Sequence, residues 1–169
     1  MAANAPLTLV NSGTVALAGQ TESNTNNNDG DAPPTTVNSI PNLSKAFATN
    51  PVGVGQSSAL IFTITSGLNN PAQSGLGFTD TLPANMVIAT PAGVVNACSG
   101  SVTATANTGI ITLTGGSLAS GAASCTLTVQ VKGNLPGSYV NSTANGNISA
   151  LVGGLTATGL TSAHRLPPG

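Results

Sequence analysis

The sequence predicts an all-β protein, an antiparallel Ig-like β-sandwich preceded by an extended N-terminal strand of the donor type. Three observations predict this fold class. Short segments alternate between apolar and polar residues, which is the period of a half-buried strand. Residues that favour helices, such as Glu, Lys, Gln and Arg, are scarce, whereas Thr is frequent. Turn signals recur at intervals of about 8–12 residues, and no window has the period of an amphipathic helix.

The first 41 residues divide into an arm and a linker. Residues 1–20 form the arm, whose apolar residues share one parity and therefore one face of a strand. These residues are Leu7, Leu9, Val15 and Leu17. Residues 21–41 are rich in Asn, contain Pro and hold three of the four acidic residues. That composition is typical of a linker.

Residues 42–163 carry the repeated strand patterns and are expected to form the sandwich. Within SSALIFTITS, Leu60, Phe62 and Ile64 fall on one face, and SCTLTVQVKG shows the same alternation from Cys125 onward. Further patterns occur in GLGFTDTLP, MVIATPAGVV, SVTATA, GIITLTGG and LTATGLTSA. GSYVNSTA and NISALVGG flank Asn145-Gly146, which predicts a β-hairpin. Residues 164–169 are expected to be a solvated C-terminal tail.

The scarcity of charge excludes several classes of partner. The chain has seven formal charges in 169 residues and a net charge of −1. Binding to nucleic acid or to an anionic membrane needs clustered Lys and Arg, and the three cations here are scattered. No apolar run approaches the length of about 18 residues that a membrane span needs. A chain with so little charge repulsion is expected to associate.

The two cysteines indicate export. Cys98 and Cys125 are expected to form a disulfide, which would close a loop and stabilise the fold. The alternative is a pair of buried free thiols in a cytosolic protein. We expect an extracellular, cell-surface location, although MAANAPLTLV lacks the basic start and apolar core of a secretory signal.

Several motifs resemble a known family of surface modules. Over about residues 42–145 the sequence contains, in order, NLSKAFATNPVGVGQSSALIFTIT, GFTDTLPANMVIATP, NACSGSVTA, SGAASCTLTVQVKG and GSYVNSTA. This series resembles the domain-of-unknown-function-eleven repeat of bacterial surface proteins. The shared features are an early lysine, a T-D-x-L-P corner and a late Y-x-N-x-(S/T)-A strand. The resemblance implies an Ig-like stalk or surface module without a general catalytic role. Stalks repeat the domain many times, whereas this chain has one copy and an arm.

The inventory of reactive residues does not predict an enzyme, a cofactor or a metal site. His164 is the single histidine, so neither a zinc site nor a serine nucleophile has its usual partners. Asn26, Asn28, Asp29 and Asp31 offer oxygen ligands of the kind that calcium takes. Their spacing does not match a calcium-binding loop, so a solvated linker is the preferred interpretation.

Three residues predict a self-modification. In some exported Ig-like domains, a lysine on the first strand forms an amide with an asparagine on the last strand, assisted by a buried acid. Here Lys45, Asp80 and Asn141 lie on the candidate first, central and last strands. Burial would favour the neutral, nucleophilic amine and a protonated carboxyl. The alternative is that Lys45 makes an ordinary surface ion pair, while the Asp80 side chain separately caps the turn at Thr-Asp-Thr-Leu-Pro.

Taken together, the sequence predicts a structural subunit of an extracellular filament, pilus-like or matrix-like, whose partners are copies of itself. The arm, with no core of its own, would add its strand to the sheet of the next subunit. A host or matrix surface is a further expected partner. Alternatives are an adhesin or stalk module that binds glycan or protein, and a component of an S-layer or sheath.

Overall fold

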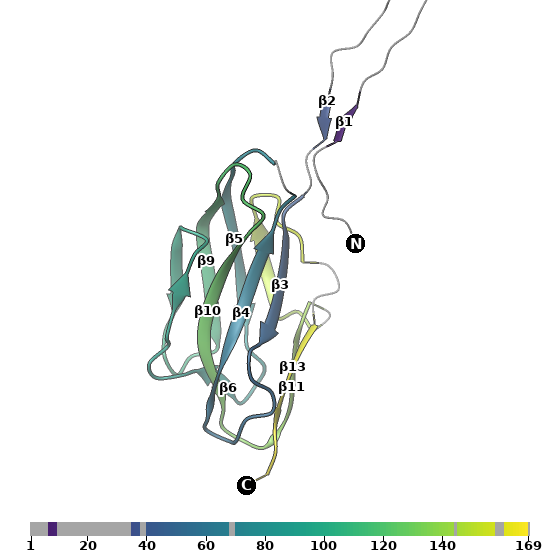
Figure 1. Cartoon of the computed structure of the whole chain (residues 1–169). Helices are drawn as coiled ribbons and strands as arrows, with labels where there is room; N and C mark the ends of the chain where they lie inside the picture. The colour runs from purple at the N-terminus through teal and green to yellow at the C-terminus, as the bar shows by residue number, and fades with distance from the viewer. Residues whose placement is uncertain are drawn as a thin grey trace, which may run out of the picture.

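The computed structural model confirms the predicted all-β sandwich (Figure 1). It describes residues 7–9, 35–37, 40–67, 70–143, 145–157 and 161–168. Two antiparallel sheets pack face to face, and their inward-facing side chains form one core. The described residues contain strands, turns and bends, and no helix that could cross a membrane.

The first sheet has five strands, with β10 at its centre. In spatial order they are β3 (Asn42–Phe47), β4 (Ser57–Thr65), β10 (Ser124–Gly133) and β6 (Met86–Ile88), with β7 (Val95–Asn96) beside β6 on the same edge of β10. The ladder between β10 and β4 runs without interruption from Ser124↔Thr65 to Lys132↔Ser57. This register turns the apolar residues of both strands toward the same face, as the alternation predicts.

The second sheet has four strands, ordered β12-β5-β9-β8. Their bounds are β5 (Gln73–Thr81), β8 (Ser101–Ala104), β9 (Ile110–Leu118) and β12 (Ile148–Val152). The β5–β9 ladder shifts register between Gln73 and Phe78, and the β12–β5 ladder shifts between Ser149 and Val152. Such irregularities locally increase the twist of a sheet.

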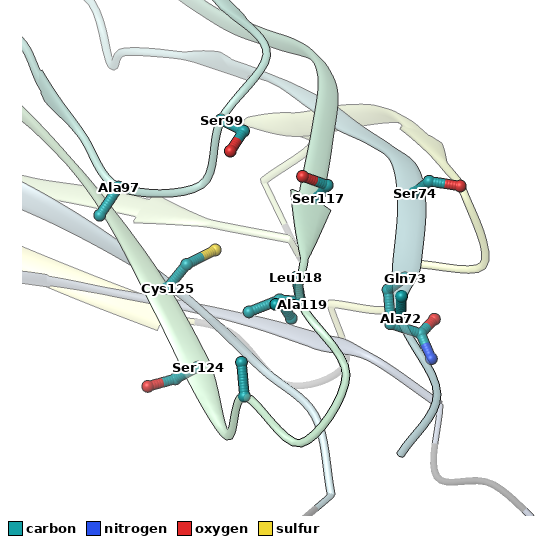
Figure 2. A pocket seen from close by; sticks show the side chains of 11 residues that line it. Ala72, Gln73, Ser74, Ala97, Ser99, Ser117, Leu118, Ala119, Ser124 and Cys125 are labelled. Atoms are coloured by element: carbon teal, nitrogen blue, oxygen red, sulfur yellow. The ribbon is translucent and has the colours of Figure 1, made fainter. Parts of the chain in front are cut away.

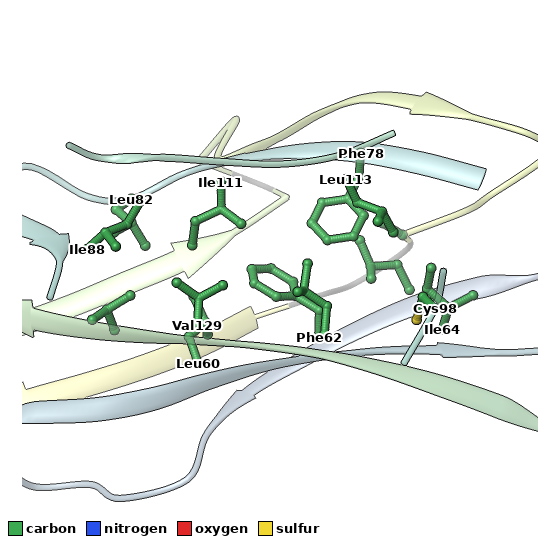
Figure 3. Packing of buried hydrophobic residues seen from close by; sticks show 14 of the residues in the cluster. Leu60, Phe62, Ile64, Phe78, Leu82, Ile88, Cys98, Ile111, Leu113 and Val129 are labelled. Atoms are coloured by element: carbon green, nitrogen blue, oxygen red, sulfur yellow. The ribbon is translucent and has the colours of Figure 1, made fainter. Parts of the chain in front are cut away.

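The core lies between these sheets (Figure 3). Leu60, Phe62 and Val129 from the first sheet face Phe78 and Ile111 from the second, and all five side chains are buried. The Phe62 and Phe78 rings are tilted by 38° with their centroids 4.9 Å apart. This ring arrangement contributes about 0.5–1.5 kcal/mol of stabilisation beyond that from burying the two rings.

The predicted hairpin at Asn145-Gly146 is wrong in its pairing. A turn does occur there, and Gly146 has φ 69°. The strands on either side separate: β11 (Gly137–Ser142) pairs with β13 (Thr161–Leu166), whereas β12 pairs with β5. The turn chemistry permits a reversal, but the partner of each strand is decided by which surface it buries.

The predicted C-terminal tail is also wrong, because residues 164–166 form the second half of β13. This strand contacts β3 as well as pairing with β11, and it runs three residues beyond the expected boundary at residue 163. Its last residue, Leu166, is 1% exposed and packs directly over Gly133. A side chain on Gly133 would place its Cβ 2.5 Å from Leu166 Cδ2, so glycine is needed for β13 to dock.

The arm and linker contain a strand each. β1 (Leu7–Leu9) pairs antiparallel with β2 (Thr35–Val37), which lies inside the stretch that composition assigned to the linker. These strands form a separate two-stranded sheet and are not hydrogen-bonded to either sheet of the sandwich. Val15 and Leu17, the other two apolar residues predicted for the arm, lie outside the described residues.

Candidate functional site

Three polar residues occupy positions that the strand alternation assigns to the core. Lys45 lies on β3, Asp80 on β5 and Asn141 on β11. Each follows, two residues later, a buried apolar side chain on the same face: Leu43, Phe78 and Tyr139 respectively. Because side chains two apart point the same way in a strand, all three are directed inward. Counting backbone and side chain together, Lys45 is 7% exposed, and Asp80 and Asn141 are 0% exposed.

The three side chains form a closed hydrogen-bonded network. Lys45 Nζ donates to Asp80 Oδ1 over 2.6 Å and also to Asn141 Oδ1. Asn141 Nδ2 donates to the other carboxylate oxygen, Asp80 Oδ2, over 2.8 Å. The carboxyl group of Asp80 therefore bridges the amine of Lys45 and the amide nitrogen of Asn141. The structure brings together the three residues that the sequence singled out, although 96 positions separate Lys45 from Asn141.

Burial pushes both ionisable groups toward their neutral forms. Desolvation lowers the pKa of Lys45, and the negative charge of Asp80 and its hydrogen bond oppose this shift. Desolvation likewise raises the pKa of Asp80, against the effects of Lys45 and Asn141. The Lys45 and Asp80 side chains are both 0% exposed, so water does not reach the pair. Burial thus shifts both groups in the direction of a neutral amine beside a carboxylic acid.

The network is costly to bury, and its three groups are of complementary chemical types. Removing two charges from water costs several kcal/mol per ion, and a buried ion pair is often no more stabilising than apolar residues of the same volume. A neutral amine held against a carboxamide, with a carboxyl group that contacts both, is a nucleophile with an electrophile and a proton carrier. Because the Lys45 and Asp80 side chains are buried and bonded to each other and to Asn141, the surface ion pair of Lys45 and the turn cap by Asp80 are wrong interpretations.

The two cysteines are joined in a disulfide. Cys98 lies in the segment that crosses from β7 in one sheet to β8 in the other, and Cys125 is the second residue of β10. The sulfur atoms are 2.03 Å apart and the Cα atoms 5.0 Å apart. The bond ties the crossover segment to the central strand of the first sheet.

A shallow hollow lies beside the disulfide (Figure 2). It is lined by small or neutral side chains, among them Ser74, Ser99, Ser117 and Ser124. None of its lining residues is charged, so it lacks the convergent acids and bases of an active site.

His164 is the buried residue that the sequence analysis missed. It was expected in a solvated tail, but it is 0% exposed and stacks on Phe47 with ring centroids 4.4 Å apart. Among the described residues neither ring nitrogen has a hydrogen-bond partner, and burial lowers the pKa of the imidazole. The signal that could have revealed it is the alternation of Ser162, His164 and Leu166, which share one buried face.

Other candidate ligands do not converge. Within the described ranges, no group of three or more His, Cys, Asp or Glu side chains could hold a metal ion. Asn26, Asn28, Asp29 and Asp31 of the linker lie outside those ranges.

Comparisons with known proteins place the sandwich in a family. A search of curated proteins found no match. Among solved structures, a non-cellulosomal cohesin from the hyperthermophilic archaeon Archaeoglobus fulgidus is similar, with a TM-score of 0.50 and 7% sequence identity. The alignment covers 75% of this chain and 92% of the cohesin, and at that identity it shows a common fold. The profile of a domain of unknown function, DUF7933, matches residues 41–164, which include the network and both cysteines. The chain therefore belongs to the DUF7933 family.

Proposed function

We propose that this protein is a structural subunit of an extracellular filament, and that its N-terminal strand joins each copy to the next. The observation that carries the proposal is the position of β1 and β2. Three residue pairs, from Leu7↔Val37 to Leu9↔Thr35, form a ribbon outside both sheets of the sandwich. An isolated two-stranded ribbon is marginally stable at best in water. A neighbouring subunit would supply the surface that it lacks.

The sandwich offers edges on which such a strand could pair. β12 and β8 end the second sheet, and neither pairs on its outer side with another described strand. β12 is the more apolar of these edges, with Leu151 38% and Val152 52% exposed. An open edge accepts an incoming strand through main-chain hydrogen bonds. A contact between an arm and the edge of the next copy does not close on itself, so it produces a filament.

The surface composition also supports assembly outside the cell. Of the four charged residues within the described ranges, Lys45 and Asp80 are buried, which leaves Lys132 and Arg165 at the surface. Contacts between such surfaces are little affected by salt, because they do not depend on charge. The disulfide is typical of an oxidising, extracellular compartment.

An adhesive or stalk role receives less support from the positions of the aromatic residues. Phe62, Phe78 and Tyr139 are buried, and Phe47 stacks on His164. With three Phe, one Tyr and no Trp in the whole chain, no aromatic side chain remains for an exposed glycan-binding platform. The scarcity of acids, bases and histidine in the chain is consistent with a structural role without turnover of a substrate.

Removal of residues 1–20 tests the proposal. The full chain should form filaments visible by negative-stain microscopy, whereas the shortened chain should remain monomeric and unfold at the same temperature. A peptide of residues 1–20 should shorten the filaments by capping them. The matched control is the same peptide with Leu7→Asp and Leu9→Asp, which should not cap. Filaments formed by the shortened chain would show that the arm is not the joint.

A further inference from the structure

We propose that Lys45 and Asn141 join covalently, by an amide bond from Lys45 Nζ to Asn141 Cγ with release of ammonia, and that Asp80 carries the proton. The protein would thus modify itself once, during or after folding. The network geometry carries this inference, which goes beyond the filament proposal and does not depend on how subunits join.

Folding places the reacting groups in contact. Lys45 Nζ is hydrogen-bonded to the oxygen of the Asn141 carboxamide, so the nucleophile lies next to the carbonyl that it would attack. The two residues come from β3 and β11, and the inward alternation of both strands holds the side chains there. Holding two groups in such a geometry removes most of the entropic barrier of a bimolecular reaction.

The carboxyl group of Asp80 is placed to carry a proton from one nitrogen to the other. One of its oxygens accepts from Lys45 Nζ over 2.6 Å, and the other accepts from Asn141 Nδ2 over 2.8 Å. A carboxyl group can release a proton from one oxygen while the other takes one up. An amide nitrogen is a poor leaving group unless it is protonated. The Asp80 carboxyl group can supply that proton to Asn141 Nδ2, which allows ammonia to leave.

Atoms and charges balance in the following sequence, which starts from the ionised pair of Lys45 and Asp80. A proton first moves from the Lys45 ammonium to Asp80, which leaves an amine and a carboxylic acid. The Nζ lone pair then forms a bond to Asn141 Cγ, and the carbonyl π electrons move to Oδ1. Asp80 donates its proton to Nδ2 and takes one from Nζ. When the carbonyl re-forms, the Cγ–Nδ2 bond breaks and ammonia leaves. Asp80 ends protonated, and no oxidant or other reactant is consumed.

The surroundings favour the product. The reacting side chains are shielded from solvent, which excludes the water that could hydrolyse the bond or solvate the charged starting pair. The amide that forms is neutral, so it relieves the desolvation of the lysine charge.

Intact mass of the full, denatured chain is the first test. The expected value is lower than the sequence mass by one ammonia, in addition to the two hydrogens lost in the disulfide. Asn145-Gly146 can also lose ammonia by cyclising to a succinimide, so the deficit must be assigned to Lys45.

Trypsin provides that assignment, because the chain has only three cleavage sites, at Lys45, Lys132 and Arg165. An unmodified chain yields fragments 1–45, 46–132, 133–165 and 166–169. The amide would block cleavage at Lys45 and link fragment 1–132 to fragment 133–165 in one branched species. Both cysteines lie within 46–132, so the disulfide cannot produce this link.

Three substitutions complete the test. Lys45→Met and Asp80→Asn should each restore the unmodified mass and abolish the branched species, the second while retaining both reacting groups. Lys132→Met, which removes the other lysine and its cleavage site, should keep the ammonia deficit and give fragment 1–165 uncut, whereas a chain without the amide would give 1–45 and 46–165. A wild-type chain with the unmodified mass, or a branched species that persists in the Lys45→Met or Asp80→Asn variant, would overturn the proposal. The wild-type result stands even if a variant fails to fold.

Discussion

The disulfide should stabilise the sandwich by an amount that follows from the loop it closes. Cys98 and Cys125 are 27 positions apart in sequence. In the chain-entropy account, closing such a loop removes freedom from the unfolded chain worth about 3.5 kcal/mol at 25 °C. Replacing both residues, as Cys98→Ala with Cys125→Ala, should therefore lower the free energy of unfolding by about that amount. The midpoint of thermal unfolding should fall by about 7–14 °C.

Urea unfolding, followed by far-ultraviolet circular dichroism, would measure this effect. The wild-type protein in a reducing agent is the matched control, because it loses the loop constraint without losing either side chain. Both reduced and substituted proteins should unfold at lower urea with a steeper dependence on urea, because the unconstrained chain exposes more surface. A decrease in the free energy of unfolding below about 1 kcal/mol in both proteins would refute the reasoning. It would mean that the disulfide does not restrict the unfolded chain as the chain-entropy account assumes.

Three further predictions concern the core and β13. Phe62→Ala should lower the free energy of unfolding by about 3–5 kcal/mol in urea, because the ring is 0% exposed and its loss leaves a cavity. Gly133→Ala should lower the free energy of unfolding by about 1–3 kcal/mol, because the added Cβ would displace Leu166. Gly53→Ala is the matched control and should be nearly neutral in the same assay, because its Cβ would lie at an ordinary 3.5 Å from its nearest neighbour. Burial lowers the pKa of His164 below its usual value of about 6.5, so the unfolded chain takes up a proton that the folded chain resists. The free energy of unfolding should therefore be unaffected by His164 above that pH and fall as the pH drops below it, by at most about 1.4 kcal/mol per pH unit. In the same pH series, His164→Phe should lack the fall that is due to this histidine.

The sandwich was predictable because alternation and turn chemistry agree over most of the chain. SSALIFTITS and SCTLTVQVKG give β4 and β10, and the same parity that predicts their buried faces also sets their register. The inward positions of Lys45, Asp80 and Asn141 were open to prediction for a related reason. Each falls on the inward parity of a strand, where an ionisable or amide group is unusual unless it is paired.

Long-range pairing was not predictable from the same patterns. The turn at Asn145-Gly146 is a local property, but β11 finds its partner in β13, and β12 finds its own in β5. His164 was missed because a polar sequence near a terminus is usually solvated. Its burial depends on Phe47, more than a hundred positions away, which no local pattern reveals.

The positions of Lys45 on β3 and Asn141 on β11 have a mechanical consequence. Tension that enters the sandwich along β3 would reach Lys45, the fourth residue of that strand. The proposed amide would then pass the tension directly to Asn141. Of the 96 residue steps between them, 27 already lie inside the disulfide loop. The amide would shield the other 69, which could otherwise extend by about 230–250 Å. Within each subunit, tension would then bypass the hydrophobic core, and the sandwich itself would extend little under load.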